Sequence, residues 1–224
     1  MTLSIAGRCA RTGQFGIAIS SSSPAVAARC AWVRAGVGAA CTQNITDPRL
    51  GTRLLDLMAE GRSAREAMEA VVESEPLIGF RQLSAIDANG GTAMWSGQGT
   101  LGLYATATGP DCVAAANLLA SEDVPMAMVG AFAEQPEVDL GDRLLAGLAA
   151  GIAAGGEAGP VHSAGLLIAW DVPWPVTDLR VDWSDNPIHD LTALWRLWRP
   201  QAADYRQRAL DPGAAPSYGV PGDE

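Results

Sequence analysis

The sequence predicts an α+β domain, in which strands and helices are grouped along the chain instead of alternating strictly. Three observations carry this prediction. The chain opens on an apolar hairpin pattern, a later block repeats leucine at helical spacing, and strand patterns return after further helices. Such grouping favours layered sheets and helices over an alternating βαβ fold. With 224 residues, 48% of them hydrophobic, the chain is long enough for one domain with a sizeable core.

Turn and cap signals separate the elements of the first half. Asn89-Gly90 is a strong hairpin signal. Ser63 and Glu66 form a capping box, in which the serine hydroxyl accepts from a helix amide and the glutamate reaches back. The predicted elements are strands at 3–5 and 15–19, a loop with a short helical piece at 21–36, a strand at 36–42, helices at 48–58 and 63–72, and strands at 83–87 and 92–95.

In the second half, helix patterns come before strands. The alanine-rich run from Cys112 to Leu119 predicts a helix, and Asn186-Pro187 is a cap followed by a favoured first-turn proline. Pro, Gly and Ala dominate from Asp211 onward, so we expect a single domain over 1–210 and a loosely attached tail over 211–224. The other predicted elements are helices at 125–132 and 139–154, strands at 164–170 and 176–181, and a helix from 187.

Composition argues against several classes of partner and location. The net charge is -10 and the basic residues form no cluster, which argues against nucleic acid and against an anionic membrane. The longest apolar run, 144–154, is too short to span a bilayer, and no signal peptide is visible. The four cysteines contain no C-x-x-C pair, which predicts reduced thiols in a cytoplasmic protein. A disulfide between two of them stays open.

Thr2 is the first candidate for chemistry. It begins an apolar strand directly behind Met1, and methionine is generally removed when the second residue is small. Its removal leaves a hydroxyl beside a free α-amine, which is a nucleophile with its own base. The alternative is that a β-branched residue simply starts a strand.

Other catalytic motifs are weak. Residues 97–102 match G-x-G-x-x-G, but a dinucleotide site needs a helix to begin there, and the strand-like LYATATG follows. No metal-binding motif accompanies the two histidines, His162 and His189, so we expect no metal and no cofactor. G-x-S-x-G is absent. His162 is either a partly exposed turn residue or part of a site.

Polar residues beside predicted buried elements are further candidates. Gln43 and Asn44 follow a buried strand, Arg81 and Gln82 precede another, and Asn117 lies in an apolar run. A buried amide without partners costs about 1–3 kcal/mol, so each of these side chains has either structural partners or a ligand. The residues alone leave both readings open.

Several segments together resemble a known family. They are TLSIAGR with TGQFGIAISS, AWVRAGVGAACTQNITDPRLG, RQLSAIDANGG, NLLASEDVPMAM, GGEAG with HSAGLLI, and VTDLRVD. In order and spacing they resemble the domain-of-unknown-function family 1028, which is placed among the Ntn (N-terminal nucleophile) hydrolases. The resemblance runs from Thr2 to about Leu197. It implies a four-layer αββα sandwich and amide-bond hydrolysis by an N-terminal Thr, Ser or Cys, with no inherited substrate.

The resemblance makes Thr2 the expected nucleophile, because similar members carry Thr after Met with no propeptide. Three segments depart from the family pattern. Asp47 stands in place of Asn in Gln-x-x-Thr-Asn-Pro, only Asn117 is kept of Gln-Gly-Asn, and the turn at 155–163 lacks the usual basic residues. These departures put the substrate class in doubt more than the fold, and they leave open an inactive relative.

The sequence thus predicts an Ntn-type amidohydrolase acting on a small amide or ureido compound. Thr2 attacks the carbonyl and its amine takes the proton. Asn117 and a backbone amide around 41–44 are expected to bind the oxyanion, and Arg34 to lower the pKa of the amine through its charge. The residues expected to contact substrate are Ser22, Gln43, Asn44, Arg81, Gln82, Glu157, His162 and Ser163.

Two further expectations concern ligands and assembly. Arg34, Arg49, Arg53 and Arg81 fall near the expected site loops, which predicts a carboxylate-bearing substrate, unless they only pair with acidic surface residues. The many tryptophans, among them Trp174 in a Pro-Trp-Pro turn, predict a homo-oligomer. The alternative functions are an inactive binding protein that keeps the Ntn shell and a nucleotide-binding module around Gly97.

Overall fold

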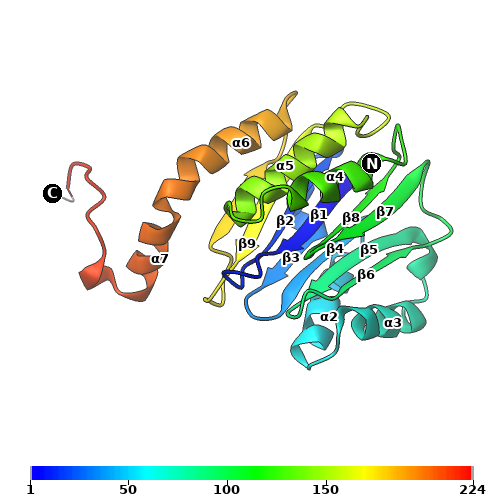
Figure 1. Ribbon diagram of the computed structural model, residues 1–224, viewed down its shortest axis with the longest axis horizontal. Coiled ribbons are helices and arrows are strands. Elements are labelled where there is room, and N and C mark those ends of the chain that lie inside the picture. Colours follow the sequence, from blue (N-terminus) through cyan, green and yellow to red (C-terminus); the bar gives the residue numbers. More distant parts are fainter. Residues whose placement is uncertain (1, 223–224) are drawn as a thin grey trace.

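Two antiparallel sheets form the centre of the molecule (Figure 1). The computed structural model describes residues 2–222, so Met1 and its removal, like the last two residues of the predicted tail, lie outside the described residues. The larger sheet has six strands in the order β10-β9-β2-β1-β8-β7, and the smaller has four in the order β3-β4-β5-β6. This confirms the predicted α+β class, with both sheets antiparallel.

In the larger sheet, the N-terminal strand occupies a central position. Thr2 pairs with Asn117 on one side, and Leu3 pairs with Ser20 on the other. Because β1 has a neighbour on both sides, its first residue is fixed within the sheet. The strands of this sheet are β1 (Thr2–Arg8), β2 (Phe15–Ser21), β7 (Tyr104–Gly109), β8 (Cys112–Asn117), β9 (Ser163–Ala169) and β10 (Thr177–Val181).

The smaller sheet contains the hairpin that is predicted at Asn89-Gly90. Its strands are β3 (Ala31–Arg34), β4 (Gly38–Asn44), β5 (Arg81–Asp87) and β6 (Thr92–Ser96). Asn44 pairs with Arg81 at one end of the sheet, and Gly38 pairs with Asp87 at the other. The two ends of the smaller sheet therefore present different residues.

Helices α2 and α3 begin with side-chain caps, whereas α6 begins at Pro187 as predicted but Asn186 makes no side-chain cap bond. Asp47 accepts from the Arg49 amide ahead of α2, and Ser63 and Glu66 complete the capping box of α3. The helices are α1 (Ala27–Cys30), α2 (Pro48–Ala59), α3 (Ala64–Ser74), α4 (Val124–Ala133), α5 (Leu140–Ala153), α6 (Pro187–Trp198) and α7 (Ala202–Leu210), with short 3-10 turns η1 (Ile78–Phe80), η2 (Arg199–Gln201) and η3 (Pro212–Ala214).

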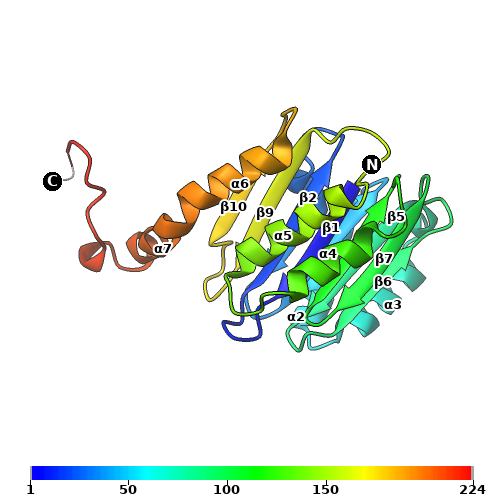
Figure 2. The same cartoon turned by 45° about the horizontal axis from the view of Figure 1, so that its top comes forward.

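Apolar packing joins these elements in three clusters. Phe132 and Leu144 belong to the cluster that packs α4 and α5 on the larger sheet. Ile17 and Ile86 belong to the cluster between the two sheets. Leu54 belongs to the cluster that packs α2 and α3 on the smaller sheet. The outer face of the larger sheet is covered by α4, α5 and α6, and the outer face of the smaller sheet by α2 and α3 (Figures 1 and 2).

The predicted helix at 112–119 is wrong, because residues 112–117 form strand β8 between β1 and β7. Alanine has high helix propensity, but burial between two neighbouring strands overrides it here. Its small side chains suit the crowded interior, since all six strand residues are buried. Residues 31–34 form a strand inside the segment expected to be a loop with a helical piece.

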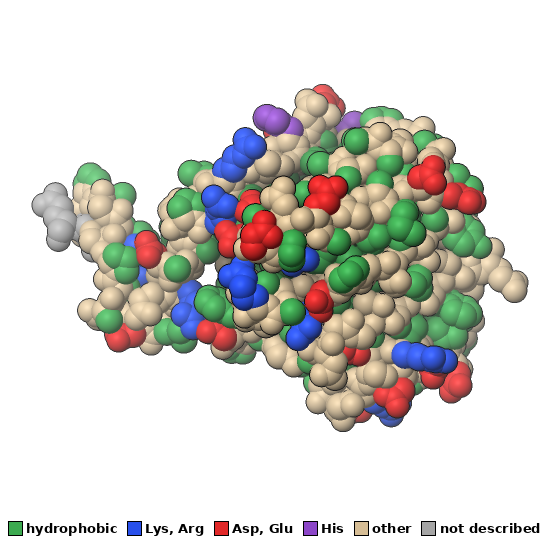
Figure 3. Space-filling view, in the orientation of Figure 1, with side chains coloured by type: hydrophobic (Ala, Val, Ile, Leu, Met, Phe, Trp, Pro, Cys, Tyr) green, Lys and Arg blue, Asp and Glu red, His purple; other side chains and the backbone are tan. Residues whose placement is uncertain are grey.

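The chain beyond α6 projects from the body of the molecule (Figures 1 and 3). Helix α7 was not predicted, and Arg208 of this helix donates to the carbonyls of Pro216 and Ser217 and lies over the Tyr218 ring. The division at residue 210 stays a prediction. Within residues 2–222, no helix is long and apolar enough to cross a membrane. All four cysteines are free and buried.

Candidate functional site

One edge of the gap between the sheets gathers most of the predicted site residues. Thr2 and Ser4 lie on the face of β1 that meets the smaller sheet, because alternate strand residues share a face and Ser4 bonds Gln43 of β4. Asn117 sits across from Thr2 on β8 and bonds Gln82 of β5. Strand ends from both sheets therefore converge at this edge, which we call the Thr2 end.

Thr2 is held at the start of its strand with its side chain enclosed. The residue is 5% exposed, and its Oγ1 donates to Ser21 Oγ at 3.4 Å. Ser21 Oγ lies 2.9 Å from Ser23 Oγ. The hydroxyl of Thr2 thus begins a short chain of hydroxyl groups that follows the end of β2.

Three buried carboxamides link the two sheets behind Thr2. Gln43 Nε2 donates to Gln82 Oε1 at 2.8 Å, and Asn117 Nδ2 donates to the same oxygen at 3.0 Å. Ser4 Oγ donates to Gln43 Oε1 at 2.7 Å. Removing one partner of a buried hydrogen bond is expensive, so this network fixes the orientation of the amides.

Asn117 has one polar atom without a partner. Its Oδ1 is fully buried and accepts no hydrogen bond from any described residue. An orphaned acceptor next to the first residue of β1 suits an N–H donor. The sequence predicts that Asn117 donates a hydrogen bond to the oxyanion. In the structure its Nδ2 already donates to Gln82, and the atom without a partner is the acceptor Oδ1.

Glu157 approaches the same edge from the α5–β9 connection. Gly155 and Gly156 both have positive φ, which allows the tight turn that brings Glu157 beside Leu119. Glu157 Oε2 accepts from the Ser22 amide at 3.3 Å, and Oε1 is buried without a partner among the described residues. Burial raises the pKa of this carboxyl to about 7, against the opposing effect of the Ser22 hydrogen bond. Glu157 is therefore poised to exchange a proton near neutral pH.

Ser163 and His162 support the site from beside it. Ser163 Oγ donates to the Ser23 carbonyl at 2.6 Å and accepts from the Val26 amide at 3.2 Å. The His162 amide donates to the Ser21 carbonyl, and its ring stacks on Trp183 with centroids 4.4 Å apart. Both residues have structural partners that hold the end of β2.

Asn44, too, has structural bonds. Its Nδ2 donates to the carbonyls of Phe80 and Gly99, and its Oδ1 accepts from the Leu101 amide. It adopts a positive φ of 73°, which asparagine tolerates better than most residues. Asn44 thereby ties the 97–103 loop to the Thr2 end.

A pocket of about 340 Å³ lies behind the turn that carries Glu157. Its lining residues are contributed by the turn itself and by the segment from Asp185 to His189. Thr2 does not line it. This pocket neighbours the Thr2 end without opening on the hydroxyl.

The prediction that Arg34 lies beside the nucleophile is wrong. Arg34 pairs with Gly38, at the end of the smaller sheet opposite Asn44, and its guanidinium bonds Asp56 at 2.8 Å. The error came from counting strands without knowing which end of each strand meets Thr2. Because Arg34 lies at the opposite end of the smaller sheet, it does not act on the pKa of the Thr2 amine as predicted.

The expected arginine cluster is also not formed. Arg49 pairs with Asp47 at 2.6 Å, which lowers the pKa of that carboxyl, and Arg53 donates to Ser74. Arg81 lies at the Thr2 end, but its Nη1 donates to the Ile45 carbonyl. Surface pairing, the alternative kept open above, holds for Arg34 and Arg49.

The glycine-rich hexamer at 97–102 joins two strands. It is followed by β7, so no helix N-terminus is available there for a pyrophosphate. Gly99 donates to the Gly79 carbonyl instead. In the part of the chain that the structure describes, no group of three His, Cys, Asp or Glu side chains is placed to hold a metal ion.

Comparison with known proteins gives the family. The sequence model of a family of unknown function, DUF1028, matches residues 2–191. The chain belongs to DUF1028. The crystal structure of protein SPO2555 from Silicibacter pomeroyi, described as a DUF1028 protein, is 27% identical with a TM-score of 0.85, over 92% of this chain and 90% of that one.

A second solved structure is similar over its length but much more distant. Anbu (ancestral beta-subunit) from Yersinia bercovieri is 10% identical with a TM-score of 0.35, over 92% of this chain and 97% of that one. No curated protein matches.

Within this DUF1028 chain, sequence reasoning missed two hydroxyl groups of the site. Ser4 and Ser21 were not singled out, although both lie on strands at the Thr2 end. A signal was present: Thr2 and Ser4 alternate with the apolar Leu3 and Ile5, which marks a polar face at the start of an otherwise buried strand.

Proposed function

We propose that this DUF1028 protein is an Ntn-type amidohydrolase, with Thr2 as nucleophile after removal of Met1. The position of Thr2 carries the proposal. It is the first residue of a central strand, its hydroxyl is enclosed, and an orphaned acceptor on Asn117 lies on the paired residue. An N-terminal amine at this position would supply the N–H donor that Asn117 Oδ1 lacks.

The packing order supports the finer fold assignment. Helices α4 and α5 cover the larger sheet, the smaller sheet packs on its other face, and α2 and α3 cover the smaller sheet. We take this order as the four-layer αββα sandwich of the Ntn type. The four free thiols fit the cytoplasmic location that we also propose.

In the proposed reaction, Thr2 Oγ1 bonds to the substrate carbonyl carbon while its proton moves to the Thr2 amine. The amine then gives that proton to the leaving nitrogen as the C–N bond breaks, and water hydrolyses the resulting ester to restore Thr2. Asn117 orients the amine through Oδ1.

In this scheme, Glu157 accepts a proton from the Thr2 amine. An α-amine with a reference pKa of about 8 is mostly protonated at neutral pH and must lose that proton to act as a base. Glu157 bonds the amide next to Ser21, which itself bonds Thr2. Its raised pKa lets it take the amine proton near pH 7.

The proposed substrate is a small amide or ureido compound, with a carboxylate as the group that Arg81 would recognise. Arg81 lies on β5 directly before Gln82, which belongs to the network of buried carboxamides. Its Nε is buried without a partner among the described side chains. A guanidinium binds a carboxylate through two parallel hydrogen bonds.

Hydrolysis of a substrate panel tests the proposal. The panel contains N-carbamoyl amino acids, γ-glutamyl amides, ring ureides and neutral amides. We expect turnover of at least one class, a loss of at least about a thousandfold in Thr2→Ala, and partial activity in Thr2→Ser. Thr108→Ala, an exposed threonine on β7, is the matched control.

Undiminished turnover by Thr2→Ala would rule the mechanism out. Intact mass of the same samples separates the inactive-binder alternative. Loss of one methionine accompanies activity in our account, whereas retained methionine, ligand binding and no turnover would favour a binding protein.

A further inference from the structure

Arg143 on α5 is a buried cation without an ion-pair partner. The residue is only 6% exposed, and no carboxylate of the described residues lies within ion-pair distance. Its Nε donates to the Phe132 carbonyl at 3.0 Å, and its guanidinium lies 3.9 Å from the centre of the Phe132 ring. One of its five N–H donors is therefore satisfied by the described part of the chain.

Such an arrangement is unusual in a protein interior. Arginine is almost never fully buried unless it is paired, because desolvating the charge is costly. Burial in fact lowers the pKa of Arg143. Its Nη groups are not among the fully enclosed atoms without a partner, so they remain accessible to an anion from outside the protein.

A pocket of about 470 Å³ adjoins Arg143 at the end of β1 opposite Thr2. Its walls include the apolar residues Ala10, Pro110, Ala133 and Pro136, and Arg11 stands at its rim. Strand β1 has seven residues in all, so its two ends lie about 20 Å apart. The pocket is therefore separate from the proposed catalytic site.

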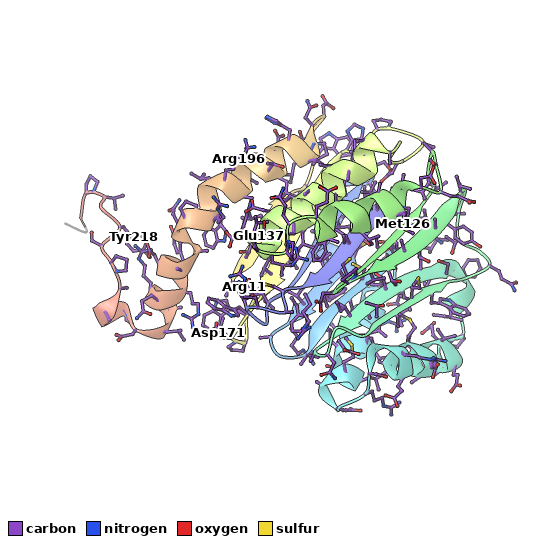
Figure 4. The ribbon with its side chains drawn as sticks, viewed as in Figure 1. Arg11, Met126, Glu137, Asp171, Arg196 and Tyr218 are labelled. Atoms are coloured by element: carbon purple, nitrogen blue, oxygen red, sulfur yellow. The ribbon has the colours of Figure 1, made fainter. Side chains whose placement is uncertain are left out.

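Asp111 and Glu137 line this pocket and act on Arg143 through their charge, but neither forms an ion pair with it. Asp111 is engaged by Arg8 at 2.8 Å. Glu137 is exposed, and it is the Glu137 carbonyl, not the carboxylate, that accepts from Arg11 at 3.0 Å. Figure 4 shows Arg11 and Glu137 together at this end of the molecule. With Asp111 paired to Arg8, the two arginines Arg11 and Arg143 outnumber the Glu137 carboxylate, so the lining carries a net positive charge.

We propose that this pocket binds a small organic carboxylate with an apolar body. The carboxylate would take two parallel hydrogen bonds from Arg143, with Arg11 adding charge at the rim. The apolar walls fit a hydrocarbon or aromatic body. Inorganic phosphate fits less well, because its charged oxygens would lose water and face mostly alanine and proline side chains, which cannot donate hydrogen bonds.

Thermal unfolding and calorimetric titration with benzoate test the proposal. We expect saturable binding to the full-length protein, with a melting temperature raised by roughly 5 °C at a hundred times Kd. Benzamide, which has the same shape without the charge, and inorganic phosphate should each bind at least tenfold more weakly. Arg143→Gln should weaken benzoate binding at least tenfold, and Arg11→Gln about threefold. Arg180→Gln, which breaks an exposed pair with Asp178, should leave binding unchanged.

Equal responses to benzoate and benzamide, non-saturable binding, or unchanged affinity in Arg143→Gln would each overturn the proposal. If Arg143→Gln does not fold, Ala133→Trp replaces it. Ala133 is only half-buried, so a larger side chain there fills the pocket without entering the core. Benzoate affinity that survives Ala133→Trp would then contradict the assignment.

Discussion

The two ends of β1 differ in how they hold polar groups. At the Thr2 end, hydroxyls and carboxamides predominate beside the raised-pKa Glu157, and the fixed charge of Arg81 is bonded to the Ile45 carbonyl. At the opposite end, fixed charges predominate, in the Arg8–Asp111 pair and in Arg143. One strand thus joins a region suited to moving protons to a region suited to holding an anion.

This difference follows from what each chemistry requires. A base must be unprotonated to accept a proton, and a fixed charge close to it would shift its pKa strongly at low dielectric. An anion site has the opposite need, since a permanently charged guanidinium is useful there. Substitutions at the two ends of β1 should therefore have unequal effects on activity and stability.

The largest expected effect in this comparison is that of Asn117→Leu. Removing Oδ1 frees the Thr2 amine to rotate, and we expect kcat to fall by roughly 10²–10³-fold. Arg8→Gln, at the other end of the same strand, should stay within twofold. Steady-state rates on the substrate found in the panel measure both. Comparable losses in the two variants would remove the distinction between the ends.

Glu157→Gln should change how stability depends on pH. The folded pKa of about 7 lies above the ordinary 4.5, so the folded state holds the proton longer than the unfolded state. The contribution of Glu157 to the free energy of unfolding is fully present below about pH 4.5. It decreases as the pH rises and is lost above about pH 7. The shift corresponds to at most about 3 kcal/mol.

Urea unfolding at pH 4.5 and at pH 8 measures this change. Relative to the parent protein, the Gln variant should be more stable at pH 8 than at pH 4.5. Glu122→Gln, at an exposed position, is the control and should show no such difference. Parallel pH curves for the parent and Glu157→Gln would contradict a raised pKa.

Gly7→Ala tests packing at the far end of β1. An added Cβ would lie 2.6 Å from the Phe132 ring, which also supports Arg143. We expect a loss of about 1–3 kcal/mol in the free energy of unfolding. Gly130→Ala in α4, where a Cβ meets nothing within 4 Å, should gain about 0.5–1 kcal/mol. A neutral Gly7→Ala would mean that the Phe132 ring moves freely.

The smallest expected effect on either end concerns assembly. Trp183 is 61% exposed and Trp174 is also exposed, so we expect a two-fold dimer that covers them. Light scattering at micromolar concentration should give twice the mass of one chain. The mass of a single chain would count against the homo-oligomer.

Local signals were sufficient for much of the fold. The capping box at Ser63 and the Asn89-Gly90 turn depend only on neighbouring residues, and both are confirmed. The strand at 112–117 could not be predicted in this way, because it also pairs with β1, which lies far earlier in the sequence.

The site shows the same limit. Thr2, Gln43, Gln82 and Asn117 were all singled out, since each is a polar residue at the edge of an apolar segment. Which strand ends meet was not visible, and this is why Arg34 was placed beside Thr2. The acceptor role of Asn117 Oδ1 could not be predicted either, because it depends on Gln82 Oε1 occupying the amide nitrogen.

Covalent trapping of Thr2 tests the central claim most directly. The purified protein is treated with a β-lactone, which acylates an activated hydroxyl, and its N-terminal peptide is analysed by mass spectrometry. We predict a single adduct on Thr2 in a peptide that lacks Met1, formed faster than in Asn117→Leu and absent in Thr2→Ala. An adduct on another residue, or labelling of a chain that keeps Met1, would contradict an N-terminal nucleophile.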